Sequence, residues 1–235
     1  MIVACMVVHN EAETIAHAIR SVKAYVDRFV VVDAVFDTNP VEAVRSTDDT
    51  HAVAHRMTEG KPLTYWQGTS KIEENVARNL YLDELAPGDW ALVVDGDEVL
   101  YGGHAQIEAL IERIRAGEIP AVPIPGMHNR AVGIPVYTQR VHVNGSALDV
   151  TLEQYETAPI TCSVGVMARF FEVDPGIRYP EGPSNQGLFR DGRWVGRPAH
   201  VVSDVFMVNH RIRQSHEAYQ ADYEWLSKVR EAVPA

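Results

Sequence analysis

The sequence predicts an α/β fold with a mostly parallel sheet flanked by helices. Apolar runs of four to seven residues alternate with amphipathic segments through the first hundred residues. The apolar runs are continuous, which is typical of strands covered by helices on both faces. Strands that alternate with helices in this way favour a parallel sheet.

Four strands and three helices are expected in this first region. Helices are predicted to begin at two capping patterns, Asn10 with Glu13 and Ser70 with Glu73, and near Ser46. Each carries apolar residues at helical spacing, so that one face packs on the sheet. The expected strands are 2–8, 29–32, 63–66 and 90–94.

The pattern changes after Leu100, where proline and glycine become frequent and the strands less clear. We expect the second half to elaborate the first within a single domain, 1–235. Asn144-Gly145 suits a hairpin turn. The expected elements of this half are a helix at 104–116, a strand-like stretch at 120–143, an irregular stretch at 153–200, a strand at 205–210 and a closing helix at 214–229.

Composition limits the possible functions. The chain has 235 residues, 46% of them hydrophobic, and a net charge of −11, as in an ordinary globular protein without a broad basic surface for nucleic acid. Two cysteines, Cys5 and Cys162, are too few for a disulfide framework or a zinc site. The first residues lack a basic leader, and no apolar run reaches bilayer length. We therefore expect a cytoplasmic protein.

The acidic segment Asp95-Gly96-Asp97-Glu98 follows the last apolar run of the first region. A strand that ends in carboxylates delivers them to the carboxyl edge of the sheet, where open α/β folds bind ligands. A turn at Gly96 lets both acids converge. Converging carboxylates favour a hard cation such as Mn²⁺ or Mg²⁺. The alternative is a solvated acidic loop.

Four ordered segments carry a resemblance to a known family: Val7 to Glu11, Val30 to Asp33, Ala77-Arg78-Asn79, and Gly88 to Glu98. In this order they resemble family 2 glycosyltransferases of the GT-A (Rossmann-like) fold. The resemblance implies a nucleotide-sugar-binding half, 1–100, and an acceptor-binding half, 101–235. One departure is that the family's Ser-Thr-Asp-x-Thr segment lies late, at Ser46 to Thr50. It indicates an insertion at 34–45, unless Asp37-Thr38-Asn39 has taken over part of that role.

The resemblance also implies roles for individual residues. Asp97 would bind the metal, with Asp95 near the ribose or a metal-bound water and His210 completing the metal shell. Asp33 would contact the base, and Arg78 the diphosphate. An inverting transfer also needs a base near the acceptor hydroxyl, and Glu181 is preferred because it sits in a turn, 179–182, where a loop would line the pocket. The other candidate acids of the second half are Glu153, Glu172, Asp174 and Asp191. Val8, Asn10, Glu11 and Gly96 would line the nucleotide. Each of three residues also has a purely structural interpretation. Glu11 could stabilise the first turn of a helix through the helix dipole. Arg78 could be a solvated arginine on a helix, and His210 a partly buried histidine that bonds to the backbone.

The implied activity is metal-dependent transfer of a sugar from a nucleotide diphosphate sugar, UDP-linked by preference, to an acceptor hydroxyl, with inversion. The acceptor is open: a saccharide, lipid, protein or nucleic acid base. One alternative is a nucleotidyltransferase of similar fold, although the acidic loop after the first strand does not suit a triphosphate. Another is a catalytically silent nucleotide-sugar-binding protein, which an intact acidic pair disfavours.

Overall fold

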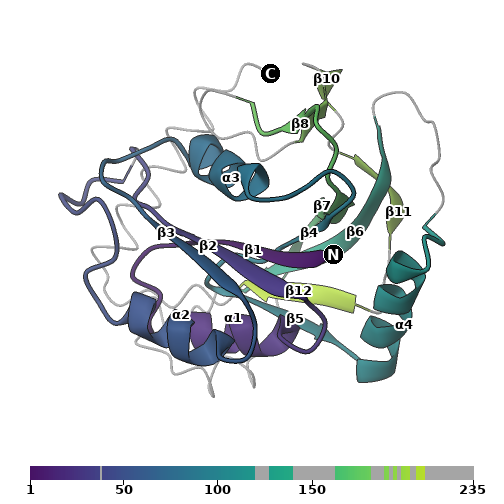
Figure 1. Ribbon diagram of the computed structural model, residues 1–235, viewed down its shortest axis with the longest axis horizontal. Coiled ribbons are helices and arrows are strands. Elements are labelled where there is room, and N and C mark those ends of the chain that lie inside the picture. Colours follow the sequence, from purple (N-terminus) through teal and green to yellow (C-terminus); the bar gives the residue numbers. More distant parts are fainter. Residues whose placement is uncertain are drawn as a thin grey trace.

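The computed structural model describes residues 1–37, 39–119, 127–139, 162–180, 188–190, 193–194, 197–201 and 205–209. Its described strands form a nine-stranded sheet and a small three-stranded sheet (Figure 1). The large sheet has the order β3-β2-β1-β4-β7-β6-β12-β5, with β11 paired to β6. The predicted α/β class with a mostly parallel sheet and flanking helices is confirmed.

The first half supplies the parallel part of the sheet. β2 and β4 pair with β1 on either side in parallel, and β3 pairs in parallel with β2. The prediction for β1 is confirmed residue for residue, and the other three strands agree within one residue at each end. The elements of this half are β1 (Ile2–Val8), α1 (Ile15–Val22), β2 (Arg28–Asp33), α2 (Thr50–Thr58), β3 (Leu63–Gln67), α3 (Glu74–Asp83) and β4 (Trp90–Val93).

Strand β1 lies in the middle of two apolar layers. Alternate residues of a strand point to opposite faces, and all seven residues of β1 are buried. Ala4 and Met6 belong to a core cluster with α1, α2 and α4, whereas Cys5 belongs to a second cluster with α3. Figure 1 shows α3 above the sheet, and α1 and α2 below it. This burial explains why the strand is apolar without alternation.

The second half completes the same sheet with pairs of both directions, since β6 pairs in parallel with β11 and β12. β7 pairs antiparallel with both β4 and β6, and β5 pairs antiparallel with β12. The predicted helix at 104–116 and the predicted strand at 205–210 are confirmed, whereas β5 and β7 were not predicted. The elements are β5 (Glu98–Gly102), α4 (His104–Arg115), β6 (Met127–Gln139), β7 (Cys162–Glu172), β8 (Ile177–Arg178), β9 (Phe189–Arg190), β10 (Arg193–Trp194), β11 (Arg197–Val201) and β12 (Val205–Asn209).

Three predicted helix starts are wrong. α1 begins at Ile15, because Asn10 adopts a left-handed backbone (φ 53°) and its side chain bonds outside the helix. α3 begins at Glu74, and its capping residue Glu73 makes no side-chain cap. α2 begins at Thr50, four residues after Ser46. The predicted Asn144-Gly145 hairpin and the helix at 214–229 lie outside the described residues. None of the described helices is long and apolar enough to cross a bilayer.

Candidate functional site

The carboxyl ends of the parallel strands meet at one edge of the sheet. Val8 pairs with Asp33, and Asp33 pairs with Gln67 on the next strand. On the other side of β1, the Val94 amide donates to the Cys5 carbonyl at 3.0 Å. The loops that follow β1, β2 and β4 therefore lie together at this edge, which we call the carboxyl edge.

The acidic turn packs directly against the end of β1. The Gly96 amide donates to the Val7 carbonyl at 3.3 Å, and the Glu98 amide donates to the Asp95 carbonyl at 2.9 Å. A Cβ at Gly96 would lie 2.8 Å from Val8 Cγ1 and 3.0 Å from Glu11 Cγ. The absence of a side chain at Gly96 thus lets the turn approach the loop after β1.

Asp95 is held by two arginines from distant parts of the chain. Arg78 on α3 donates to both carboxylate oxygens, at 3.2 and 3.1 Å, and Arg169 on β7 approaches one of them at 3.5 Å. Burial acts to raise the pKa of Asp95, but the two guanidinium charges outweigh it and hold this pKa at about 2. Asp95 is consequently a paired carboxylate throughout the physiological pH range.

The pairing continues into a chain of alternating charges. Glu74 accepts from Arg78 at 2.9 Å, and Glu98 accepts from Arg169 at 2.7 Å. Glu98 also accepts from the Asp95 amide at 3.0 Å, which closes the turn. Burial raises the pKa of Glu98 to about 7, against the lowering effect of Arg169. We call these five residues the charge ladder: Glu74, Arg78, Asp95, Arg169 and Glu98.

Asp97 is half-buried on the same turn, between Gly96 and the buried Glu98. After burial, the charge of Asp97 is one of the causes that raise the pKa of Glu98. Among the described residues, no group of three or more histidine, cysteine, aspartate or glutamate side chains is placed to hold a metal ion. A cation at Asp97 would therefore need ligands beyond the described side chains.

Asp33 is fully buried, and its carboxylate organises the loops around it. One oxygen accepts from the amide and the hydroxyl of Ser46, both at 2.8 Å, and the other accepts from the Tyr65 hydroxyl at 3.1 Å. Burial, followed by the charge of Asp33, raises the pKa of Tyr65. The late Ser46 segment thus lies at the end of β2 despite the intervening residues.

The segment 46–50 is joined to the loop after β1 by side-chain bonds. The Thr47 amide donates to Asn10 Oδ1 at 2.8 Å, and the Glu11 amide donates to Thr50 Oγ1 at 2.7 Å. Asp48 accepts from the Ala12 amide at 3.1 Å. These bonds fix two of the loops at the carboxyl edge against each other.

The stretch 34–45 is closed at its base. The Val35 amide donates to the Val44 carbonyl at 3.3 Å, and the Ile72 amide donates to the Val35 carbonyl at 3.1 Å. The Asp37 amide donates back to the Ile72 carbonyl at 3.0 Å. A loop that closes on itself can be inserted without moving the residues on either side. Ser46 accordingly remains beside Asp33.

The structure groups some predicted site residues and not others. Val8, Asn10, Glu11, Asp33, Arg78, Asp95, Gly96 and Asp97 all lie at or beside the carboxyl edge. Glu181 and His210 lie outside the described residues. Glu172 and Asp174, two other acids of the second half, lie at the opposite end of β4. Glu172 pairs with Trp90, the first residue of that strand. Asp174 follows Val173, whose amide donates to the Asp89 carbonyl.

Two members of the charge ladder, Glu74 and Arg169, were not expected beside Asp95. Glu74 lies four residues before Arg78 on the same helix, and this spacing in the sequence predicts an ion pair. Arg169 carries no such signal, because it reaches Asp95 only through the pairing of β7 with β4. Its side chain is 6% exposed, and its Nε lacks a hydrogen-bond partner among the described residues.

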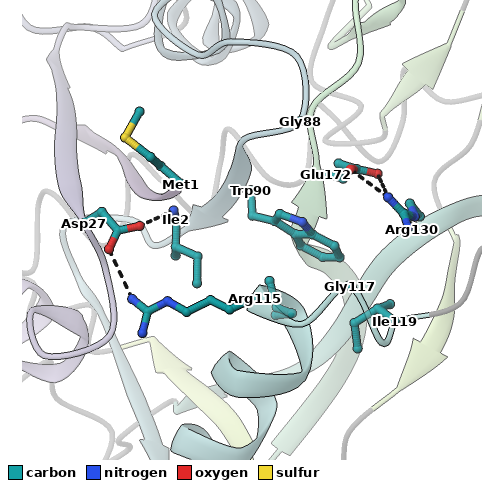
Figure 2. A pocket seen from close by; sticks show the side chains of 11 residues that line it. Met1, Ile2, Asp27, Gly88, Trp90, Arg115, Gly117, Ile119, Arg130 and Glu172 are labelled. Atoms are coloured by element: carbon teal, nitrogen blue, oxygen red, sulfur yellow. Dashed lines mark hydrogen bonds and ion pairs between the residues drawn. The ribbon is translucent and has the colours of Figure 1, made fainter.

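A pocket of about 290 Å³ lies at the amino end of β1 and β4, away from the carboxyl edge (Figure 2). Trp90 lies between two ion pairs on its walls, Arg115 with Asp27 at 3.1 Å and Arg130 with Glu172 at 2.8 Å. Each of these two arginines is thus already paired with an acid of the same pocket.

No protein-family model matches the chain. Over 97 residues it is 35% identical to a Rickettsia felis protein named uncharacterized glycosyltransferase, a stretch that makes up 41% of this chain and 29% of that protein. The chain thus matches less than a third of the relative's length.

Two solved structures are similar at lower identity. S. aureus TarS 1–349 is 16% identical with a TM-score of 0.39, covering 63% of this chain and 37% of that one. A mannosyltransferase from Pyrobaculum calidifontis, solved with GDP-Man and Mn²⁺, is 19% identical with a TM-score of 0.39, covering 57% of this chain and 34% of that one. At such values neither structure bears on the activity of this chain.

Proposed function

We propose that the chain is a glycosyltransferase of the GT-A type, resembling family 2, that takes its sugar from a nucleotide diphosphate sugar. The observation that carries the proposal is the convergence of three loops at the carboxyl edge. Asp33 and the Ser46 segment lie at the end of β2, and Asp97 lies in the turn after β4. Ligands of open α/β sheets bind at this edge. The 97-residue match to a protein named glycosyltransferase supports the same activity.

In this proposal the loops after β1 and β2 bind the nucleoside. Asp33 acts through its neighbours, because its oxygens already accept three hydrogen bonds from Ser46 and Tyr65. Its role is then to hold those two side chains beside the base. Asn10 and Glu11 would also lie beside the nucleoside, since the Asn10 side chain and the Glu11 amide contact the 46–50 segment.

The residues at the acidic turn fit a divalent cation of the Mg²⁺ or Mn²⁺ class. Such ions are commonly bound through one or two carboxylates together with substrate phosphates, so a large protein cluster is not required. Asp97 would supply the protein oxygen, while the charge ladder keeps Asp95 in place. A bound cation offsets the negative charge that builds on a departing diphosphate. His210 would be a further ligand, and Glu181 would act as the base.

The first experiment measures binding of UDP, GDP and their sugars by calorimetry and thermal shift, with and without Mn²⁺. We expect one nucleotide to raise the melting temperature only when Mn²⁺ is present. Asp97→Asn should lose this dependence. Asp83→Asn is the matched control, because Asp83 is an exposed carboxylate (57%) on α3. Absence of binding by every nucleotide would contradict the proposal.

Product analysis then separates the remaining functions. Slow metal-dependent hydrolysis of the bound sugar donor indicates a transferase that is using water as acceptor. Release of pyrophosphate from a nucleoside triphosphate instead indicates a nucleotidyltransferase. Binding without either reaction, across a panel of saccharide and lipid acceptors, indicates a silent nucleotide-sugar-binding protein. UDP donors are tested first and GDP donors second.

A further inference from the structure

Helix α2 exposes two histidines one helical turn apart. His51 and His55 stand at positions i and i+4, and both are exposed. Their ring centroids are 4.4 Å apart, so the two imidazoles lie against each other on the surface. Residues four apart on a helix lie on the same face, which is the spacing at which two imidazoles can reach one ion.

A third ring holds this pair in place. Tyr65 on β3 meets His51 edge-on with ring centroids 4.7 Å apart, and its centroid is 5.7 Å from that of His55. The Tyr65 hydroxyl in turn donates to the buried Asp33 at 3.1 Å. Tyr65 is thus fixed at its far end and limits the positions open to the two imidazoles. Ligands that are held in place before binding lose less entropy when the ion arrives.

We propose that His51 and His55 chelate a transition-metal ion of the Zn²⁺, Ni²⁺ or Cu²⁺ class. Neutral imidazole is a ligand that these ions favour, whereas Mg²⁺ and Mn²⁺ favour oxygen. The described residues place no third histidine, cysteine or carboxylate within such a cluster. Within the described part of the chain the ion thus has two protein ligands, and water completes its shell, so that it exchanges with the solution.

The site is separate from the cation of the proposed function in both position and chemistry. It lies on the outer face of α2, whereas Asp97 lies in the turn after β4. The two sites also select different ions. The histidines favour ions that bind nitrogen, such as Zn²⁺, whereas the acidic turn favours hard ions that bind oxygen, such as Mg²⁺. The histidine pair therefore uses other ligands than the acidic turn does, and it is joined to the proposed nucleoside site through Tyr65, which also bonds to Asp33.

The test is calorimetric titration of the metal-free protein with Zn²⁺ and with Ni²⁺ at pH 8, since metals bind the neutral imidazole. His51→Gln and His55→Gln are compared with the wild type, together with the double variant. We expect each single variant to weaken binding at least about tenfold, because removing one of two ligands abolishes chelation. Both positions are exposed, so the variants should keep their circular dichroism spectrum and melting temperature.

His104→Gln is the matched control, because His104 is exposed on α4 and has Glu108 one turn away at 3.1 Å. This variant should bind as the wild type does. The proposal is wrong if the wild type binds neither ion, or if the double variant keeps wild-type affinity and stoichiometry. It is equally wrong if only one of the two histidines matters, since a single imidazole does not chelate.

Discussion

Arg78 holds the Asp95 carboxylate through two nitrogen–oxygen contacts, of 3.2 and 3.1 Å. Arg169 adds a second positive charge 3.5 Å from the same carboxylate. A cation bound to Asp95 would also lie close to these guanidinium groups, which repel it. The two aspartates of the acidic turn therefore have different expected roles, Asp95 in holding the turn and Asp97 in binding.

Asp95→Asn should destabilise the fold much more than Asp97→Asn. Removing the charge of Asp95 leaves two buried guanidinium groups with one fewer acid, and loss of one partner of a buried ion pair costs about 3 to 5 kcal/mol. We expect about 1 kcal/mol or less for Asp97→Asn, as for most partly exposed positions. Urea denaturation at pH 7 measures both. Equal losses in the two variants would show that Asp95 has no special structural role.

The sequence predicts the parallel half of the fold well, because its strands are continuous apolar runs. The prediction for β1, Ile2 to Val8, is right because this run is apolar throughout and stops at polar residues. β7 was missed because its residues include Arg169, which interrupts the apolar pattern. That arginine is buried only because Asp95 and Glu98 are there to pair with it. Such a long-range pair leaves no local signal.

The helix start after β1 shows a local signal that a distant contact overrides. Asn10 and Glu13 have the spacing of a capping box, yet α1 begins at Ile15. Asn10 instead takes a left-handed backbone and accepts from the Thr47 amide at 2.8 Å. Asparagine tolerates that conformation, so the sequence allows both outcomes. Only the three-dimensional position of Thr47 decides between them.

Gly96→Ala should destabilise the acidic turn by crowding. The added Cβ would lie 2.8 Å from Val8 Cγ1, at the buried end of β1, and 3.0 Å from Glu11 Cγ. Overpacking of this kind costs about 1 to 3 kcal/mol. Urea denaturation gives the loss, and calorimetry with the nucleotide that binds the wild type tests whether the turn has moved. An unchanged free energy of unfolding would mean that the loop after β1 shifts at little cost to make room for the methyl group.

Ser46→Ala should weaken the contact between the loops after β1 and β2. The Ser46 hydroxyl donates to Asp33 and also accepts from the Asn10 amide, each at 2.8 Å. Loss of a donor to a buried charged acceptor costs about 1.5 to 3 kcal/mol. The measurement is the free energy of unfolding, with Ser46→Thr as the conservative control that keeps a hydroxyl. If alanine and threonine behave alike, the hydroxyl is not what holds these loops.

His9→Gln should change how stability depends on pH. His9 follows β1, and burial lowers its pKa below the ordinary value of 6.5, against the opposing charges of Asp33 and Asp48. Its Nδ1 is buried without a hydrogen-bond partner among the described residues. The unfolded chain therefore binds a proton at higher pH than the folded protein does. The stability contributed by neutral His9 is present above about pH 6.5 and is lost as the pH falls through the folded-state pKa.

Glutamine cannot take up this proton, so the wild type should lose stability relative to His9→Gln as the pH is lowered from about 8 to about 5. Urea denaturation at several pH values gives the difference in unfolding free energy. A constant m-value shows that the exposed surface of the unfolded chain has not changed. A difference that stays flat over this range would show that His9 has the same pKa in the folded and unfolded states. A difference of opposite sign would show that Asp33 and Asp48 outweigh burial and stabilise the protonated ring.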